Sequence, residues 1–411
     1  MTSIRSRCKR VFFISQVYAP SHDAISQMNA DLAVGLRDRG WDVHVLTNQV
    51  NYMSGERLPR HERIDGVRVW RTSSLPLKRT NPLARMAMYG GFLLISGPAS
   101  ALMPAPDVAV YLSTPPLVAW SAAAMRRFGK AKLVYWAQDV YPEVPIQMGY
   151  LKNPLLKRLL FSVERRVVRD MDNVVVIGDE MGRVFVKKGV PAEKVSTIPN
   201  WSIVSFENRI PRDKNPLLAE NGLSRKFVVQ YSGNMGIVHD MAPLCEAMAK
   251  TRDDGDIHWL MIGEGKRRRE IERVVEGNGL HHVTLLPYQP METLDVSLSA
   301  ADVSIISLRP EMEGLVVPSK LFSSMAAGLP IAFIGSRTGE VAGILQRHGC
   351  GRTVATGDEL IEFVKELRQN PSLCRSMGEN ARQAYVENFS REKAIDKFHD
   401  LLSETTEECA F

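Results

Sequence analysis

With 411 residues, the chain is longer than one hydrophobic core normally supports, so we expect two domains. A content of 45% hydrophobic and 24% charged residues, with five cysteines and no C-x-x-C pair, argues against a low-complexity chain, a disulfide framework and a thiolate metal site, and indicates a reducing compartment. The net charge of +6 is modest, but the N-terminal half is basic, which indicates either an anionic partner or an ordinary solvated face; among anionic partners, nucleic acid is the weakest candidate, because no nucleic-acid-binding motif accompanies the charge.

The first residues, MTSIRSRCKRVFFISQVYAP, begin like a signal peptide, with basic residues before an apolar run. That run is only about seven residues long, and no small-residue cleavage site follows it. We therefore interpret residues 10–18 as a first buried strand and expect a cytoplasmic protein. An amphipathic helix is predicted at 24–40, where apolar residues recur at helical spacing and Gly40 provides a C-terminal cap.

The rest of the first half alternates between strands and helices. Its apolar segments are mostly β-branched and uninterrupted, as expected for buried strands of a parallel sheet. We predict strands at 43–47, 67–71, 108–113, 132–139, 173–178 and 195–199, and helices at 117–128, 154–170 and 180–188.

Residues 86–106 form the longest uncharged run, MAMYGGFLLISGPASALMPAP. Its length would allow a membrane span, but its glycines, prolines and serines make it a poor one. One interpretation is a helix in the lipid headgroup region, with Tyr89 and Phe92 as anchors. The other is an ordinary buried helix. Together with the basic residues of the first half, the former predicts peripheral contact with the inner face of the cell membrane.

A polar stretch at 200–216 is typical of an interdomain linker, and the alternation of strands and helices restarts after it. A helix-rich tail ends the chain. The strands of this second half are predicted at 226–233, 257–263, 283–288, 303–307 and 330–335.

The predicted fold class is α/β, with two doubly wound Rossmann-like domains. We place the first at 1–205 and the second at 206–388, and expect a last helix at 389–405 to pack back on the first domain. In such sheets ligands bind beyond the carboxyl ends of the strands. The expected site is therefore a cleft between the two domains.

The stretch SLRPEMEGLVVPSKLFSSMAAG, from Ser307, places a long charged loop between a strand and a helix of small residues. Ser319, after Pro318, is a good N-cap, and free amides at the helix start would attract an anion beside the charge of Lys320. Glu313 offers an acceptor to sugar or ribose hydroxyls. This combination fits a nucleotide diphosphate-sugar; the alternative is a solvated loop before a capped helix.

Several short motifs occur in a specific order from Val11 to about Phe398. They are WAQDVYPE (136–143), VSTIPNW (195–201), YSGNMG (231–236), MIGEG (261–265), LPYQP (286–290) and EGLVVPSKLFSSMAAGLP (313–330). With these motifs the chain resembles the retaining GT-B glycosyltransferases of family four. It is most similar to the branch that builds bacterial surface polysaccharides such as O-antigen and colanic acid, which includes fucosamine transferases.

The resemblance implies a nucleotide diphosphate-sugar donor, with UDP as the expected nucleotide, bound mainly by the C-terminal domain. The acceptor would bind the N-terminal domain, and transfer would proceed with retention, without a cofactor and without a metal held by an Asp-x-Asp motif. By this match the donor residues are Gly233 and Asn234 at the diphosphate, Gly263 and Gly265 along the nucleotide, Tyr288 and Gln289 beside the base, Glu313 at the sugar, and the backbone of Gly314 and Leu315 at the phosphates.

The chain departs from the family pattern where the leaving diphosphate must be stabilised. Most members have Arg and Lys at the positions of Asn234 and Asp240. Because the leaving group gains about one negative charge, a cation must come from elsewhere, and Lys320 and Arg309 are the candidates. The family's ribose-binding glutamate aligns with Ser323, so ribose recognition is expected to differ.

On the acceptor side, Asp139 follows a predicted strand. It would orient the acceptor hydroxyl or assist its deprotonation; alternatively, it caps the turn before Tyr141-Pro142. Gln138 stands where the family has a histidine. Ser26 stands where the family has a glycine, a residue that permits close backbone approach to a ligand.

The favoured function is transfer of a sugar to a lipid-diphosphate-linked glycan at the membrane. A nucleotide-sugar 2-epimerase shares the architecture but needs acid and base groups around the sugar, for which only Asp139, Glu143 and Glu313 are available. A donor-binding subunit without activity would explain the missing Arg and Lys. A dehydrogenase is disfavoured, because no G-x-G-x-x-G follows the first strand.

Overall fold

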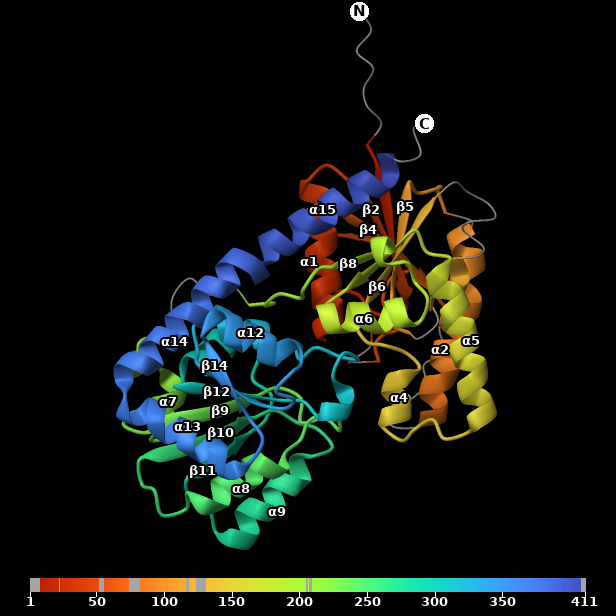
Figure 1. The fold of residues 1–411 in the computed structure, drawn as a ribbon. Coiled ribbons are helices and arrows are strands. Elements are labelled where there is room, and N and C mark those ends of the chain that lie inside the picture. Colours follow the sequence, from red (N-terminus) through yellow and green to blue (C-terminus); the bar gives the residue numbers. More distant parts are fainter. Residues whose placement is uncertain are drawn as a thin grey trace, which may run out of the picture. The chain divides into compact units, whose positions relative to one another are not determined.

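The computed structural model describes residues 8–21, 23–51, 55–73, 82–101, 103–115, 118–122, 131–204, 206 and 209–407 (Figure 1). The chain divides into two compact units. The first unit joins Met1–Pro199 to Glu392–Phe411, and the second is Asn200–Arg391. Each is a Rossmann-like α/β unit, so the predicted fold class is confirmed.

The sheet of the first unit has the strand order β3-β4-β2-β1-β5-β6-β7-β8. Its neighbours are parallel except β3 and β4, an antiparallel hairpin that turns at Asp65 and Gly66, both with positive φ. The strands are β1 Arg10–Ile14, β2 Asp42–Asn48, β3 His61–Ile64, β4 Val67–Thr72, β5 Val108–Leu112, β6 Lys132–Ala137, β7 Asn173–Val176 and β8 Val195–Thr197.

The sheet of the second unit is parallel throughout, in the order β11-β10-β9-β12-β13-β14. The apolar runs that predicted its strands are buried, as β10 illustrates with six buried residues out of six. The strands are β9 Phe227–Ser232, β10 Ile257–Ile262, β11 Val283–Leu286, β12 Val303–Ser307, β13 Ile331–Ile334 and β14 Gly351–Val354.

Helices connect the strands in both units. In the first unit they are α1 Ala24–Asp38, α2 Pro82–Ala101, the short turn η1 Val118–Ser121, α4 Glu143–Gln147, α5 Pro154–Arg169 and α6 Asp179–Lys187. In the second they are α7 Pro216–Glu220, α8 Ala242–Lys250, α9 Arg268–Asn278, α10 Leu294–Ser299, α11 Lys320–Ala326, α12 Glu340–His348, α13 Gly357–Gln369 and α14 Pro371–Ala384. The last helix is α15 Arg391–Glu407.

Helix α15 supplies part of the first unit's core. The Phe398 ring packs against that of Trp136 with centroids 5.0 Å apart, and both side chains are buried. Trp41 donates its indole N–H to His399 Nδ1 at 3.0 Å. Gly35 of α1 leaves room for Ile395, whose Cδ1 would lie 2.5 Å from a Cβ at position 35. The C-terminal helix is therefore needed to complete the domain formed by the first 199 residues.

Of the first two predicted elements, the strand is shorter than expected and the helix ends as expected. The first strand ends at Ile14 rather than at residue 18. The polar segment after Ile14 forms a turn, in which the Ser15 hydroxyl donates to the Val17 carbonyl. The prediction that Gly40 ends the helix is confirmed: it has φ 87° directly after the C-cap Arg39, and its N–H donates to the Arg37 carbonyl at 2.9 Å. In the predicted helix at 117–128, the structure describes the turn η1 and residue 122; residues 117 and 123–128 lie outside the described residues.

The membrane-anchor interpretation of Phe92 is wrong. Phe92 and Met88 lie on the covered side of α2, with exposed fractions of 3% and 6%, so they belong to the core. Leu94 and Ile95 of the same helix are exposed. Among the described residues, no helix combines the length and apolarity needed to cross a membrane.

The stretch 200–216 is fixed to the second unit rather than free. Arg212 forms a bidentate ion pair with Asp302, at 3.0 and 2.9 Å, and donates to the Ser224 carbonyl at 2.9 Å. Asn215 caps α7 by accepting from the N–H of Leu218. A polar composition thus predicted a loop correctly but could not show that its arginines hold it against the domain.

Candidate functional site

Four neighbouring strands of the second unit end beside one another, and the loops after them hold the predicted donor residues. β9 leads into Gly233, β10 into Gly263, β11 into Tyr288 and β12 into Arg309. In the sheet these strands lie in the order β11-β10-β9-β12. Because all are parallel, the structure brings these distant motifs to one edge, as the α/β topology requires.

Three glycines let the loops after β9 and β10 approach closely. Gly233, Gly263 and Gly265 have φ of 120°, 126° and 150°, a region that other residues rarely adopt. A Cβ on Gly263 would lie 2.1 Å from the Gly233 carbonyl oxygen, and one on Gly265 would lie 2.4 Å from that of Met235. The Met235 N–H donates to the Glu264 carbonyl at 2.8 Å, which joins the two loops.

Lys320 reaches from the start of α11 to the loop after β9. Its Nζ lies 3.8 Å from the centroid of the Tyr231 ring and donates to the Asn234 carbonyl at 3.4 Å. The Tyr231 hydroxyl donates to the same carbonyl at 2.8 Å. Poor solvation of the ammonium lowers the pKa of Lys320 to about 7. Because both contacts are neutral groups, the charge of the protonated form remains for a ligand.

His239 packs against the Tyr231 ring beside this loop, although no sequence pattern predicts a role for it. It is 7% exposed, its ring is T-shaped to that of Tyr231, and its Nδ1 lies 2.5 Å from the Ser307 carbonyl oxygen. Burial, with the nearby Lys320 charge, lowers the pKa of His239 to about 3. The imidazole is therefore neutral, and Nδ1–H donates to Ser307.

Asp240, which takes the place of the family's lysine, is held by Ser307. Its N–H donates to Ser307 Oγ at 2.8 Å, and that hydroxyl donates to the Asp240 carbonyl at 2.7 Å. The Asp240 carboxylate accepts from the N–H of Ala242 at the start of α8. The carboxylate therefore bonds the start of α8 and cannot supply the positive charge of a lysine, whereas Lys320 contacts the loop after β9 directly.

Glu313 occupies a defined position between two loops. Its Oε1 accepts the N–H of Glu340, at the start of α12, at 2.7 Å. A Cβ on Gly339 would lie 2.0 Å from Glu313 Cδ, so only glycine permits this approach. The carboxylate therefore lies at the N-terminus of α12, where the helix dipole favours negative charge.

The start of α11 differs from the prediction. Ser319 precedes the helix, but its backbone is already helical and its side chain makes no capping bond, so the capping prediction is wrong. The N–H of Leu315 donates to the Met312 carbonyl at 3.0 Å and is thus engaged within the loop. Gly314, with φ 71°, makes the turn between them. The Lys320 side chain remains a candidate group for attracting an anion at this helix start.

The remaining predicted donor residues line the same edge. Tyr288 is 52% exposed, and its hydroxyl donates to the Glu264 carbonyl at 3.4 Å. The Gln289 amide bonds the Pro287 carbonyl at 3.0 Å. Arg309 Nε lies 3.7 Å from Glu311 Oε2, so this carboxylate partly balances the guanidinium charge. The exposed Tyr288 ring offers a flat surface on which an aromatic base could stack.

The Ser323 side chain has a hydrogen-bond partner near the start of the second unit. Its hydroxyl accepts from Ser202 at 3.4 Å. A hydroxyl can bind one ribose oxygen, whereas a glutamate could bind two, so the expected change in ribose recognition remains a prediction.

The chemistry of this edge suits an anion. Backbone segments with glycines, a desolvated lysine and an exposed aromatic ring are the features with which proteins bind nucleoside diphosphates. Among the described residues, no three His, Cys, Asp or Glu side chains are placed to hold a metal ion.

In the first unit, Asp139 follows β6. Its N–H and that of Gln138 donate to Ser113 Oγ, at 3.3 and 3.0 Å. Desolvation raises the pKa of Asp139 to about 6. Within the described residues no N–H donates to the Asp139 carboxylate, which argues against the turn-capping alternative. Gln138 is buried beside it.

Ser26, the other predicted acceptor-side residue, is fully buried in the first turn of α1. Its hydroxyl and N–H donate to the two carboxylate oxygens of Asp23, at 2.6 and 3.0 Å. Asp23 is the N-cap of α1, so Ser26 is engaged in starting this helix.

A buried ion network holds the segment after Asp139. Lys188 Nζ donates to the Tyr141 carbonyl at 2.8 Å and to the carboxylates of Glu143 and Glu164, each at 2.9 Å. Lys188 and Glu164 are 7% and 4% exposed. Burial raises the pKa of Glu164 to about 7, against the lowering effect of Lys188. The sequence motifs did not include Lys188 or Glu164.

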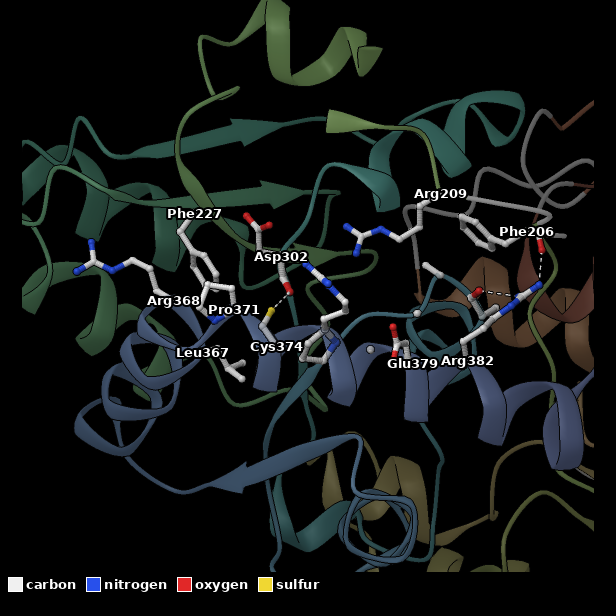
Figure 2. Close-up of a pocket in the computed structure, with 16 residues that line it drawn as sticks. Phe206, Arg209, Phe227, Asp302, Leu367, Arg368, Pro371, Cys374, Glu379 and Arg382 are labelled. Atoms are coloured by element: carbon white, nitrogen blue, oxygen red, sulfur yellow. Dashed lines mark hydrogen bonds between the residues drawn. The ribbon is translucent and has the colours of Figure 1, made fainter. Parts of the chain in front are cut away.

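A separate cavity of about 630 Å³ lies at the opposite edge of the second sheet, where β9, β12 and β13 begin (Figure 2). Arg209 lies beside it, and Arg382 of α14 donates to the carbonyls of Ala326 and Phe206. None of the predicted site residues lines it. It is the place where the 206–212 segment packs on the domain, away from the glycine loops.

Two protein-family models match most of the chain. The family model described as Glycosyl transferase 4-like domain matches residues 24–201, and the model described as Glycosyl transferases group 1 matches residues 213–384. The second match contains the glycine loops, Lys320 and Glu313.

Two curated relatives and one solved structure are similar along most of their lengths. WcaI of Escherichia coli K12, a glycosyl transferase assigned to colanic acid biosynthesis, is 27% identical over 76% of this chain and 79% of its own. The glycosyltransferase WbjE of Pseudomonas aeruginosa is 26% identical over 73% of this chain and 76% of its own. HepE of Anabaena, solved with UDP-glucose, has a TM-score of 0.70 at 15% identity over 96% of this chain and 99% of its own. The fold class is GT-B.

Proposed function

This chain is a glycosyltransferase that joins a Glycosyl transferase 4-like domain to a Glycosyl transferases group 1 domain, and we propose that it transfers a sugar from a nucleotide diphosphate-sugar to a lipid-diphosphate-linked glycan. The observation that carries the proposal is the Lys320 ammonium beside the loop of Gly233 and Asn234. A diphosphate needs both a cation and close backbone approach, and this loop provides them together.

The proposed reaction is a same-face substitution with retention. The bond between the anomeric carbon and the donor phosphate oxygen breaks while the acceptor oxygen bonds to the anomeric carbon on the same side. The acceptor proton passes to the departing phosphate oxygen. Lys320 stabilises the charge that develops on the diphosphate, and Glu313 binds hydroxyls of the donor sugar. Asp139 orients the acceptor hydroxyl.

The names of the relatives support the substrate class. Colanic acid is a surface polysaccharide, so the relation to WcaI supports a role in the assembly of such a polymer. The UDP-glucose bound by HepE supports UDP as the nucleotide. Because the first half of the chain is basic and an anionic membrane surface attracts such residues, we further propose that the protein works as a peripheral protein on the inner face of the cell membrane.

The test is a transfer assay. The purified protein is incubated with membranes that contain lipid-diphosphate acceptors and with a panel of labelled nucleotide sugars. We expect label to enter the lipid fraction with one UDP-sugar, and the product's anomeric configuration, read from NMR coupling constants, to match that of the donor. An inverted linkage would discard the mechanism. Conversion of a UDP-sugar to its 2-epimer without acceptor would instead support the epimerase alternative.

A further inference from the structure

Helix α5 of the first unit carries an unusual exposed apolar surface. Leu155, Leu156 and Leu159 are 76%, 40% and 59% exposed, and Tyr150, just before the helix, is 53% exposed. Of the sixteen residues of α5, only Glu164 and Val168 are buried. Exposed single leucines are common, but three within the first two turns of one helix form a patch that needs an explanation.

Basic residues accompany this patch and lack ion-pair partners. Among the salt bridges of the described residues, none involves Lys152 or the basic side chains of α5 itself. By contrast, Lys250, Arg267 and Arg268 of the second unit each pair with a carboxylate. The unpaired residues beside the patch are Lys152, Lys157, Arg158, Arg165, Arg166 and Arg169.

The helical spacing puts the two kinds of residue on one side. Leu155, Leu159, Arg166 and Arg169 follow one another at intervals of four, seven and three residues, so they share one face of the helix. Leucines occupy its first turns and arginines its last ones. The acidic residue of the helix, Glu164, is turned inward to Lys188; its charge also acts on Arg165, but it forms no ion pair with the exposed basic residues.

We propose that α5 docks the protein on an anionic membrane surface, with the leucines inserted among the lipid chains and the arginines on the headgroup phosphates. A helix with apolar and basic residues on one exposed side binds at such an interface by buried apolar area and by attraction to anionic lipid. This proposal rests on the proposed function, since a lipid-linked acceptor is reached only at a membrane.

The same reasoning disfavours the uncharged helix as the main contact. On α2 the exposed residues Leu94 and Ile95 stand beside the buried Phe92, and the last turn of this helix has no basic residue. The basic helix α5 offers both parts of the interaction.

The experiment measures binding of the full chain to sucrose-loaded vesicles of phosphatidylcholine with or without phosphatidylglycerol, without nucleotide sugar. The wild type should sediment only with the anionic vesicles. Replacing Leu155, Leu156 and Leu159 with serine should weaken partition at least about tenfold. Replacing Arg165, Arg166 and Arg169 with glutamine should weaken it roughly a hundredfold at low salt, since each basic residue near the surface contributes about 1 kcal/mol.

Val186→Ser and Val386→Ser serve as matched controls, because both valines are exposed, at 42% and 50%, but lie on other helices. Both should sediment like the wild type. Wild type that stays in solution with anionic vesicles, or a leucine variant that sediments as well as the wild type, would overturn the proposal.

Two further outcomes would assign the surface to another partner. A wild-type dimer that becomes a monomer in the leucine variant, by light scattering, would make α5 a contact between two copies. Binding to single-stranded RNA that displaces vesicles and is insensitive to the leucine changes would make it a nucleic-acid surface. Transfer to a short, water-soluble acceptor should persist in the leucine variant. Sedimentation without any transfer would refute the proposed function and leave the docking surface standing.

Discussion

Lys320 should couple donor binding to proton uptake. With a pKa of about 7, its ammonium and amine forms coexist near neutrality. A bound diphosphate favours the ammonium and raises this pKa. Below pH 7 the lysine is already charged, so affinity is constant; above pH 7 binding takes up a proton, and affinity should fall by up to about tenfold per pH unit. Calorimetry with a UDP-sugar, in buffers of different ionisation enthalpy, measures both the slope and the proton uptake.

The test variant is Lys320→Met. It should lose the pH dependence of donor affinity and lower turnover by about two to three orders of magnitude, the scale of one preorganised charge. Lys214→Met changes an exposed lysine of the same unit and should leave both quantities unchanged. A slope that persists in Lys320→Met would show that another group takes up the proton.

Asp139 should determine the acidic limb of the pH–rate profile, that is, the fall of turnover at low pH. Its pKa is raised to about 6 by desolvation, so below that pH it is protonated and becomes a much weaker hydrogen-bond acceptor for the acceptor hydroxyl. Turnover should therefore fall as pH drops through 6. Asp139→Asn should cut turnover at all pH values and remove this limb, with little change in donor affinity. A loss of donor affinity equal to the loss of rate would contradict an acceptor-side role.

The site was predictable from sequence only where a residue carries its own local requirement. Gly233, Gly263 and Gly265 indicate a close approach of the backbone, because residues with a side chain rarely adopt the positive φ angles of these positions. The contact of Lys320 with Tyr231 joins positions far apart in the chain and depends on the sheet order. His239 and Gly339 lack such a signal, since a single histidine or glycine has many possible roles.

At the scale of elements, the Lys188 network ties α4, α5 and α6 to the segment after Asp139. Lys188→Met would leave the buried Glu164 and the partly buried Glu143 without their cation, so we expect a loss of about 3–5 kcal/mol in the free energy of unfolding. The rate should also fall, because the Tyr141 carbonyl and Glu143 lose the bonds that hold this segment. Denaturant unfolding and the transfer assay measure the two effects.

The matched variant Glu164→Gln keeps a polar group but removes the titration. In the wild type the folded-state pKa of Glu164 is raised to about 7 from 4.5. Its contribution to stability is therefore full below pH 4.5 and lost as pH rises to about 7. Glu164→Gln should flatten the stability profile in this window. An unchanged profile would show that another group is responsible.

Strands were predicted well where apolar runs are long and buried, and missed where they are short and exposed. β10 and β12 are buried along their whole length and match their predicted spans closely. β3, with the sequence HERI, is an edge strand with exposed charged residues, and β14 begins with a glycine and an arginine. Only pairing with β4 and β13 makes strands of them.

At the scale of the whole molecule, both ends of the chain build the first unit. The structural division falls between Pro199 and Asn200, whereas the sequence-based boundary is 205. The difference arises because the residues after 199 look like a linker in composition but are fixed by their own contacts, such as that of Ser202 with Ser323. Composition reports polarity, and a domain boundary depends on which partner each side chain finds.

The return of α15 predicts that a change near the C-terminus destabilises the N-terminal domain. Phe398 is fully buried against Trp136 of β6, so Phe398→Ala should cost about 3–5 kcal/mol through lost burial and a cavity. Hydrogen exchange should show the loss in β1 and β6, with β9 and β10 less affected. Phe363→Ala, in the core of the second unit, is the matched control and should show the reverse pattern. If Phe398→Ala instead weakened β9 and β10 as much as β6, the two units would unfold together and α15 would stabilise the whole chain.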